Sequence, residues 1–144
     1  MSQTLTIRVP GEPVPQPRVK ARKSGEHATV YTPTTANVWK DLVSHFAVKA
    51  MPVCGWVKPD SKTPLQVVID LHLRRPSTHR KRERYKRTYP DNDNYEKAIF
   101  DALVWAGVMQ DDGQIAVNTT RKLIDDDWQG AVITVNLARF VEAY

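Results

Sequence analysis

Residues 65–73 place the strongest constraint on the fold, because apolar side chains recur there at every second position. The alternating members are Val67, Ile69, Leu71 and Leu73. In an extended chain these side chains lie on one face, whereas Asp70 and His72 lie on the other. This period of two predicts a β-strand with one buried face, so the chain must contain a sheet whose apolar side is covered by other elements.

Three further segments are predicted to be strands. Leu5, Ile7 and Val9 alternate with polar residues, which predicts a first strand, and residues 117–124 and 131–137 form the other two. A turn-forming sequence, Asp-Asp-Asp-Trp-Gln-Gly, separates the last two strands. This arrangement predicts that they pair with each other as a hairpin.

Two helices are predicted from apolar residues at helical spacing. The first covers residues 34–50 after a Thr-Pro-Thr start signal, and the second is capped by Asp93 or Asn94 and ends near Gly107. The order of these elements fits an α+β fold, with one mixed β-sheet and two main helices packed against it. At this length the chain is expected to form a single domain that spans residues 1–144.

The composition predicts a cytoplasmic protein with no membrane partner. No apolar run approaches the roughly 20 residues needed to cross a bilayer, and the N-terminal sequence lacks the apolar core of a signal peptide. Cys54 is the single cysteine of the sequence, so no internal disulfide can form and no zinc site is indicated.

Charge is distributed unevenly along the chain. Residues 74–90 carry eight Lys or Arg against one acid, a local net charge of +7, whereas residues 91–128 carry nine acids against three bases, a net charge of −6. A basic block beside an acidic cluster suits a protein that holds a polyanion with one part and metal cations with another. On charge alone, a solvated loop beside an acidic face is an equally good interpretation.

Two basic segments are the candidate DNA-binding surfaces. The first follows a proline-rich arm that should be extended, so its cations, two residues apart, lie on one side of the chain before a short hairpin turns at Ser24-Gly25. The second is the segment 74–90, whose charge density and lack of a period predict an exposed loop. The candidate contacts are Arg18, Lys20, Arg22, Arg74, Arg75, Arg80, Lys81, Arg82, Arg84, Lys86 and Arg87.

The acids around the second helix are the candidate catalytic group. Asp91 and Asp93 lie two residues apart at the start of that helix, and the adjacent acids Asp111 and Asp112 follow the helix. Phosphodiester hydrolysis needs a nucleophilic water and neutralisation of charge on the phosphoryl and leaving oxygens, which carboxylate-bound Mg²⁺ or Mn²⁺ supplies. Lys97, one turn beyond Asp93, can donate to a phosphate oxygen, hold the attacking water, or simply pair with Asp93 or Asp101.

Other motifs fit these residues poorly. A calcium-binding EF-hand loop that begins at Asp91 requires Gly at its sixth position and Glu at its twelfth, where the chain has Glu96 and Ala102. The sequence contains neither a Gly-rich phosphate-binding loop nor a Gly-x-Ser-x-Gly motif. On these residues alone, an aspartate-rich helix cap and turn without catalytic chemistry is still an open alternative.

Other polar residues are expected to lie outside the catalytic group. Asp70 and His72 share a strand face and are expected to support the site rather than to form it. His79 is expected at the surface, and Asp125–Asp127 are expected to form a solvated turn.

The acidic motif resembles the signature of RusA-type Holliday-junction resolvases. The matching residues are Asp91-x-Asp93-Asn94-x-x-Lys97, Asp101-Ala102-Leu103, Ala106-Gly107-Val108 and Asp111-Asp112-x-Gln114-Ile115. The similarity is specific over residues 90–115 and extends more loosely over most of the chain. The loop 74–90 is longer than the family pattern requires, which leaves the substrate preference open.

The resemblance implies a homodimeric endonuclease that uses Mg²⁺ or Mn²⁺ to make paired, symmetric cuts in four-way DNA junctions. Carried over position by position, it implies that Asp91, Asp93 and Asp112 bind the metal and that Lys97 is the catalytic lysine. Of the adjacent acids Asp111 and Asp112, the second is the predicted ligand.

Three functions follow as hypotheses. The first, which we predict, is a junction resolvase of DNA recombination and repair in the cytoplasm of a bacterial or phage-infected cell. The second is a related nuclease directed at flaps or replication forks. The third is a junction-binding protein that does not cut DNA.

Overall fold

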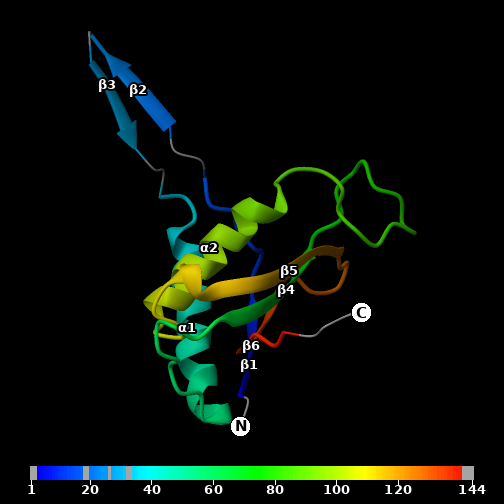
Figure 1. Ribbon diagram of the computed structural model, residues 1–144. Coiled ribbons are helices and arrows are strands. Elements are labelled where there is room, and N and C mark those ends of the chain that lie inside the picture. The colour runs from blue at the N-terminus through cyan, green and yellow to red at the C-terminus, as the bar shows by residue number, and fades with distance from the viewer. Residues whose placement is uncertain (1–2, 18–19, 26, 32–33, 141–144) are drawn as a thin grey trace.

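A computed structural model describes residues 3–17, 20–25, 27–31 and 34–140. Its centre is a four-stranded sheet with the order β1-β6-β4-β5 (Figure 1). The strands are β1 (Thr4–Pro10), β4 (Leu65–Leu73), β5 (Ile115–Ile124) and β6 (Gly130–Leu137). Strand β4 pairs antiparallel with β6 and parallel with β5, and β1 pairs antiparallel with β6. The predicted α+β fold with a mixed sheet is therefore confirmed.

Two helices, α1 (Asn37–Cys54) and α2 (Asn92–Trp105), pack on one face of this sheet (Figure 1). Every second side chain of β4 is buried, and these side chains form one hydrophobic cluster with buried residues of both helices and of β1 and β6. Full burial of a Leu, Ile or Val side chain contributes about 1.5–3 kcal/mol. A shift of β4 by one residue against its neighbours would turn all of its buried side chains toward solvent. The alternation therefore fixes the register of the sheet.

The predicted hairpin of residues 117–124 and 131–137 is wrong, because β4 lies between β5 and β6. Strand β4 has a fully buried face and hydrogen-bonded neighbours on both sides, which places it at the centre of the sheet. Strand β5 is mostly exposed and forms the sheet edge, parallel to β4. A parallel pair requires a crossover, and α2 provides it, so β4, α2 and β5 form a βαβ unit.

The first helix begins and ends later than predicted, at Asn37 and Cys54 rather than at residues 34 and 50. Pro52 lies inside its last turn and does not end the helix. Gly55 ends the helix in a left-handed conformation (φ 69°), and the Trp56 N–H donates to the Met51 carbonyl at 2.9 Å. This glycine cap is the common way to terminate a helix and satisfy its last carbonyl groups.

A separate two-stranded sheet is formed by β2 (Lys20–Ser24) and β3 (His27–Tyr31), which confirms the short hairpin predicted around Ser24-Gly25. The hairpin stands away from the four-stranded sheet and its helices (Figure 1). Lys20 and Arg22 belong to β2, whereas Arg18 lies outside the described residues. Within the described ranges, no helix is long and apolar enough to cross a membrane.

Candidate active site

Asp91 and Asp93 lie at the N-terminus of α2, but not in the geometry predicted for them. Asp91 is the N-cap residue, with an extended backbone, and the helix begins at Asn92. The prediction that Asp93 or Asn94 caps the helix is therefore wrong, and the extended segment expected to carry both acids to one side does not form. Asp93 instead lies in the first helical turn. Both residues therefore lie at the N-terminal end of α2, Asp91 as its cap and Asp93 within its first turn.

Strand β5 holds the approach to this helix in place. The Lys122 ammonium donates to the Thr88 and Pro90 carbonyls, at 2.8 Å each, and the Asn92 side chain donates to the Thr120 carbonyl at 3.2 Å. Burial lowers the pKa of Lys122, whereas the nearby Asp91 carboxylate opposes that shift. Lys122 was missed as a site residue, because its sequence neighbours show only that it belongs to a strand.

A short 3₁₀ helix, η1 (Asp112–Gln114), follows the second helix and separates the roles of two adjacent acids. The Asp111 carboxylate accepts a hydrogen bond from the Gly113 N–H at 3.3 Å, as the N-cap of η1. The Asp112 carboxylate faces α2 instead, with Oδ2 3.3 Å from the Lys97 ammonium. Asp111 therefore caps η1 while Asp112 faces Lys97, and the choice of Asp112 as the metal ligand stays a prediction.

Gln114 fixes the position of η1 by binding two parts of the chain at once. Its buried side-chain oxygen accepts from the N–H groups of Gln110 and Asp111, at 2.8 and 3.2 Å. Its side-chain nitrogen donates to the carbonyls of Asp60 and Thr63, at 2.7 and 3.1 Å. The connector before β4 is thereby tied to the segment that carries Asp112.

Lys97 lies between two carboxylates. Its ammonium is 3.0 Å from Asp101 Oδ1 and 3.3 Å from Asp112 Oδ2. The hydrogen bond to Asp101, and secondarily the one to Asp112, raises the pKa of Lys97 despite some burial. A raised pKa favours the protonated form of Lys97, which can donate a hydrogen bond or neutralise negative charge. Of the two simple pairings considered from the sequence, the structure forms the one with Asp101.

The donor chemistry of these acids fits a hard divalent cation. Within the described part of the chain, no group of three or more His, Cys, Asp or Glu side chains is arranged to hold a metal ion by itself. Mg²⁺, however, is commonly bound by one or two carboxylates together with substrate phosphates and water, rather than by a cage made only of protein atoms. Asp91, Asp93 and Asp112 supply oxygen ligands of the type that Mg²⁺ and Mn²⁺ prefer.

In a comparison with known protein families, residues 10–136 match the family described as endodeoxyribonuclease RusA. The chain belongs to the RusA family. This result confirms the resemblance found in the acidic motif, and the matched range includes both helices and all the candidate catalytic residues. RusA-family proteins are endodeoxyribonucleases that act on branched DNA junctions. A comparison with curated proteins found no match.

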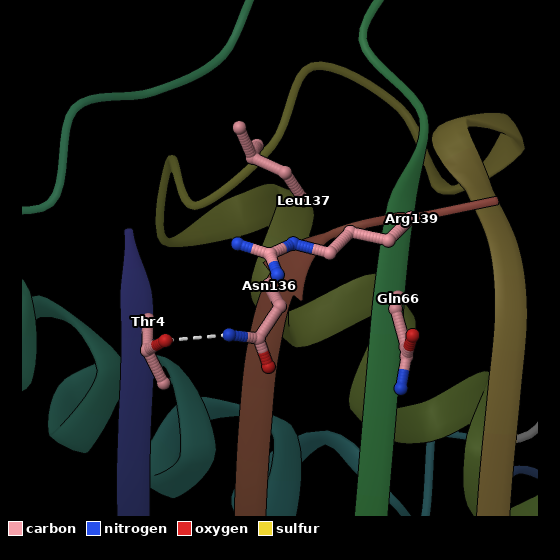
Figure 2. A pocket seen from close by; sticks show the side chains of 5 residues that line it. All are labelled: Thr4, Gln66, Asn136, Leu137 and Arg139. Carbon is pink, nitrogen blue, oxygen red and sulfur yellow. Dashed lines mark hydrogen bonds between the residues drawn. The ribbon is translucent and has the colours of Figure 1, made fainter. Parts of the chain in front are cut away.

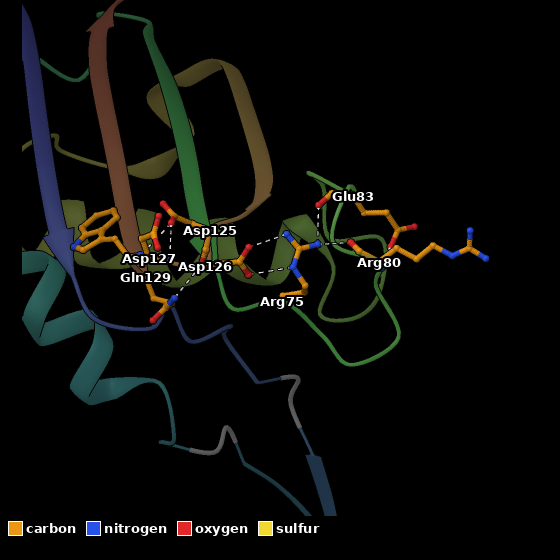
Figure 3. A network of polar contacts seen from close by, with 8 residues as sticks. Arg75, Arg80, Glu83, Asp125, Asp126, Asp127 and Gln129 are labelled. Carbon is orange, nitrogen blue, oxygen red and sulfur yellow. Dashed lines mark hydrogen bonds and ion pairs between the residues drawn. The ribbon is translucent and has the colours of Figure 1, made fainter.

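One arginine of the basic loop is an anchor in this RusA-family chain. Arg75 binds both oxygens of Asp126, with Nε 3.0 Å from Oδ1 and Nη2 2.9 Å from Oδ2 (Figure 3). Its third nitrogen, Nη1, donates to the carbonyls of Arg80 and Glu83. The Arg75 guanidinium thus fastens the 74–90 loop to the connection between β5 and β6. Asp126 is solvent-exposed, as expected for the turn Asp125–Asp127, but its carboxylate also pairs with Arg75, which the sequence did not predict.

The second half of the loop pairs with the edge of β5. The Lys86 N–H donates to the Lys122 carbonyl at 2.9 Å, and the Ile124 N–H donates to the Arg84 carbonyl at 2.8 Å. His79 is buried, contrary to its predicted surface position, and its ring nitrogen Nε2 accepts the Arg87 N–H at 3.1 Å. The basic loop therefore has a defined backbone, on which several cations are exposed: Arg74, Arg80, Lys81, Arg82, Arg84 and Arg87.

The sheet face opposite the helices carries polar pairs rather than catalytic groups. Asp70 pairs with Arg121 through two hydrogen bonds of 2.7 Å between neighbouring strands. His72 lies 2.9 Å from Asp125, whose pKa is lowered chiefly by the backbone N–H groups of Asp127 and Trp128. Neither pair includes a candidate catalytic residue, so no contact printed for Asp70 or His72 reaches the candidate site, and the supporting role expected for them stays a prediction.

Two cavities differ in their relation to the acids. One cavity, of about 310 Å³, has no acidic residue in its lining (Figure 2). It is lined by Thr4, Gln66, Asn136, Leu137 and Arg139. The other, of about 380 Å³, borders the start of α2; it is lined by Arg87, Thr88, Tyr89, Asp91 and Lys122. The second cavity combines cations with a candidate metal ligand, so it belongs to the candidate active site.

Proposed function

We propose that this RusA-family chain resolves four-way DNA junctions by paired, symmetric phosphodiester cuts, in a reaction that depends on Mg²⁺ or Mn²⁺ and leaves 5′-phosphate and 3′-hydroxyl ends. The observation that carries the proposal is the meeting of Lys97 with Asp112 at 3.3 Å. This contact joins α2, whose N-terminal end carries the other two acids, to η1, the segment that leads into β5. The acids of the family signature are thereby held on adjacent, mutually fixed elements.

The chain's own residues have distinct roles in this proposal. Asp91, Asp93 and Asp112 would hold a divalent cation, which would activate water and neutralise charge on the phosphoryl group. The protonated Lys97 donates to an oxygen of the scissile phosphate, where negative charge grows during the reaction. Asp111 and Gln114 do not contact the substrate but keep Asp112 in place.

Two basic surfaces bind the DNA backbone in this proposal. The first comprises Lys20 and Arg22 of β2, together with Arg18, which lies outside the described residues. The second is the exposed part of the loop 74–90, with Arg75 as its internal anchor. Cations bind phosphates without regard to sequence, so these surfaces position the junction, while the acidic site between them cuts it.

A two-fold dimer is the proposed working unit. Junction resolution requires cuts at matching positions in two strands of like polarity, and two identical subunits related by a two-fold axis present two identical sites. Each subunit contributes one acidic site and one set of basic surfaces. Two copies therefore double the phosphate contacts and favour a branched substrate that both subunits can engage.

The test is cleavage of four synthetic DNAs of matched sequence: a four-way junction, a flap, a fork and a linear duplex, each in Mg²⁺ and in EDTA. The proposal predicts metal-dependent cutting that is fastest on the four-way junction, with products that can be religated. Preferred cutting of the flap or fork would support the second hypothesis instead. Binding to the junction without any cutting in Mg²⁺ or Mn²⁺ would support a protein that only binds DNA.

A further inference from the structure

Lys40 is a charged residue on the buried face of α1. It has no role in the proposed reaction as described so far. Its side chain is only 6% exposed, and its ammonium lies 3.1 Å from Asp101 Oδ2. The ammonium also lies 5.2 Å from the centre of the Trp105 ring, at the end of α2. A buried cation is costly unless it is paired, so the contact with Asp101 is required wherever Lys40 is buried in this way.

Asp101 divides its two oxygens between two lysines. Oδ2 binds Lys40 from the side of α1, and Oδ1 binds Lys97 at 3.0 Å. Lys97 in turn lies 3.3 Å from Asp112. Four side chains of alternating charge therefore run from the interior of the protein to the acidic site, and the inner end is fixed by the packing of α1 against α2.

We propose that Lys40 is a positioning residue for Lys97, acting through Asp101. Because Lys40 occupies Oδ2, the Asp101 carboxylate cannot turn both oxygens toward Lys97, and the Lys97 ammonium stays within reach of Asp112 and of a phosphate. Without Lys40, the carboxylate is free to rotate and to draw the Lys97 ammonium away from Asp112. A small displacement of a catalytic group slows the reaction strongly, since a shift of about 1 Å can lower the rate on the order of 100-fold. The inference rests on the proposed role of Lys97 in cutting.

The competing explanation is that the Lys40–Asp101 pair only ties α1 to α2. The two explanations differ in how the effect of Lys40 depends on Lys97. A residue that acts through Lys97 has nothing to position once Lys97 is gone, whereas a purely structural contact matters equally with or without Lys97. A double-mutant cycle measures this dependence directly.

The experiment compares wild type, Lys40→Met, Lys97→Ala and the double variant. The single-turnover rate of junction cleavage is measured at saturating protein, and junction binding is measured separately in EDTA. We expect Lys40→Met to slow cleavage roughly tenfold, within the range for a small displacement of a catalytic group, and to leave binding unchanged. In the Lys97→Ala background the same substitution should cause no further loss. Lys40→Arg, which keeps the charge, should restore most of the rate.

Two further variants guard against misfolding. Arg121→Met breaks a more exposed ion pair, with Asp70 on the other face of the sheet, and it should cleave at the wild-type rate. If Lys40→Met does not fold, Asp101→Asn, which keeps the side-chain shape, replaces it in the same cycle. An equal loss of rate in both backgrounds, or a wild-type rate for folded Lys40→Met, would overturn the positioning role. A wild-type rate for Lys97→Ala itself would instead refute the proposed role of Lys97.

Discussion

Asp111 and Asp112 are adjacent in the chain, yet Asp111 accepts a hydrogen bond from the Gly113 backbone whereas Asp112 lies against the Lys97 ammonium. One acid therefore shapes the turn and the other faces the proposed reaction. The pair offers a matched comparison, because the two substitutions to Asn remove the same charge at neighbouring positions.

Asp112→Asn is expected to abolish cutting and to leave junction binding intact, because it removes a metal-ligand charge and none of the basic surfaces. Asp111→Asn keeps an oxygen that can cap η1, so it should retain most of the activity. Rates in Mg²⁺ and junction affinities in EDTA test both variants. If Asp111→Asn abolished cutting and Asp112→Asn did not, the assignment of the two acids would have to be exchanged.

Lys97→Ala should lower the cleavage rate by roughly 100-fold or more, in the range found when a donor to developing charge is removed. Its effect on junction affinity should be small, because the Lys97 ammonium is already paired with Asp101 and Asp112. Single-turnover rates and equilibrium binding separate the two effects. A large loss of binding with an unchanged rate for the bound junction would make Lys97 a DNA anchor instead.

The contact between Arg75 and Asp126 should control how firmly the basic loop is held. Asp126→Ala removes both hydrogen bonds from Arg75, so trypsin should cleave faster after the exposed Arg80, Lys81 and Arg82. Asp127→Ala changes the neighbouring acid, whose carboxylate has no contact with Arg75, and serves as the control. Mass spectrometry of the fragments identifies the cut positions. Equal cleavage of the two variants would show that Asp126 does not hold the loop.

Junction affinity should fall steeply as salt increases, because the exposed loop cations release counterions from the phosphates that they contact. Each phosphate contact contributes about 0.9 to the slope of log affinity against log salt concentration. Replacing Arg80, Lys81 and Arg82 together with Ser should flatten the slope by up to three such contributions. A slope identical to that of wild type would mean that this part of the loop does not bind DNA.

The sequence predicted those parts of the fold that depend on local periodicity. Alternation in residues 65–73 identified the central strand, and helical spacing identified both helices, because each pattern reports directly which side chains are buried. The pairing of β5 could not be read in this way. The residues at 125–130 are typical of a hairpin turn. The position of β5 is instead set by the crossover through α2 and by pairing with β4.

The site shows the same division between local and long-range information. The acids and Lys97 form a compact motif and were identified from it. The long-range ion pairs were not predicted, because Lys40 is 61 residues from Asp101, and Asp126, which holds the basic loop, is 51 residues from Arg75. A count of charges along the chain shows that cations are abundant, but it does not show which of them are already paired inside the protein.

In the proposed dimer, two identical acidic sites make the paired cuts. Light scattering at micromolar concentration should give about twice the chain mass of 16.4 kDa. The most direct measurement uses a mixed dimer of wild-type and Asp112→Asn subunits, purified by two different tags and incubated with a labelled four-way junction in Mg²⁺. The mixed dimer should nick the junction in one strand only, whereas the wild-type dimer should cut two strands and release two duplexes. Paired cutting by the mixed dimer at the wild-type rate would contradict this proposal.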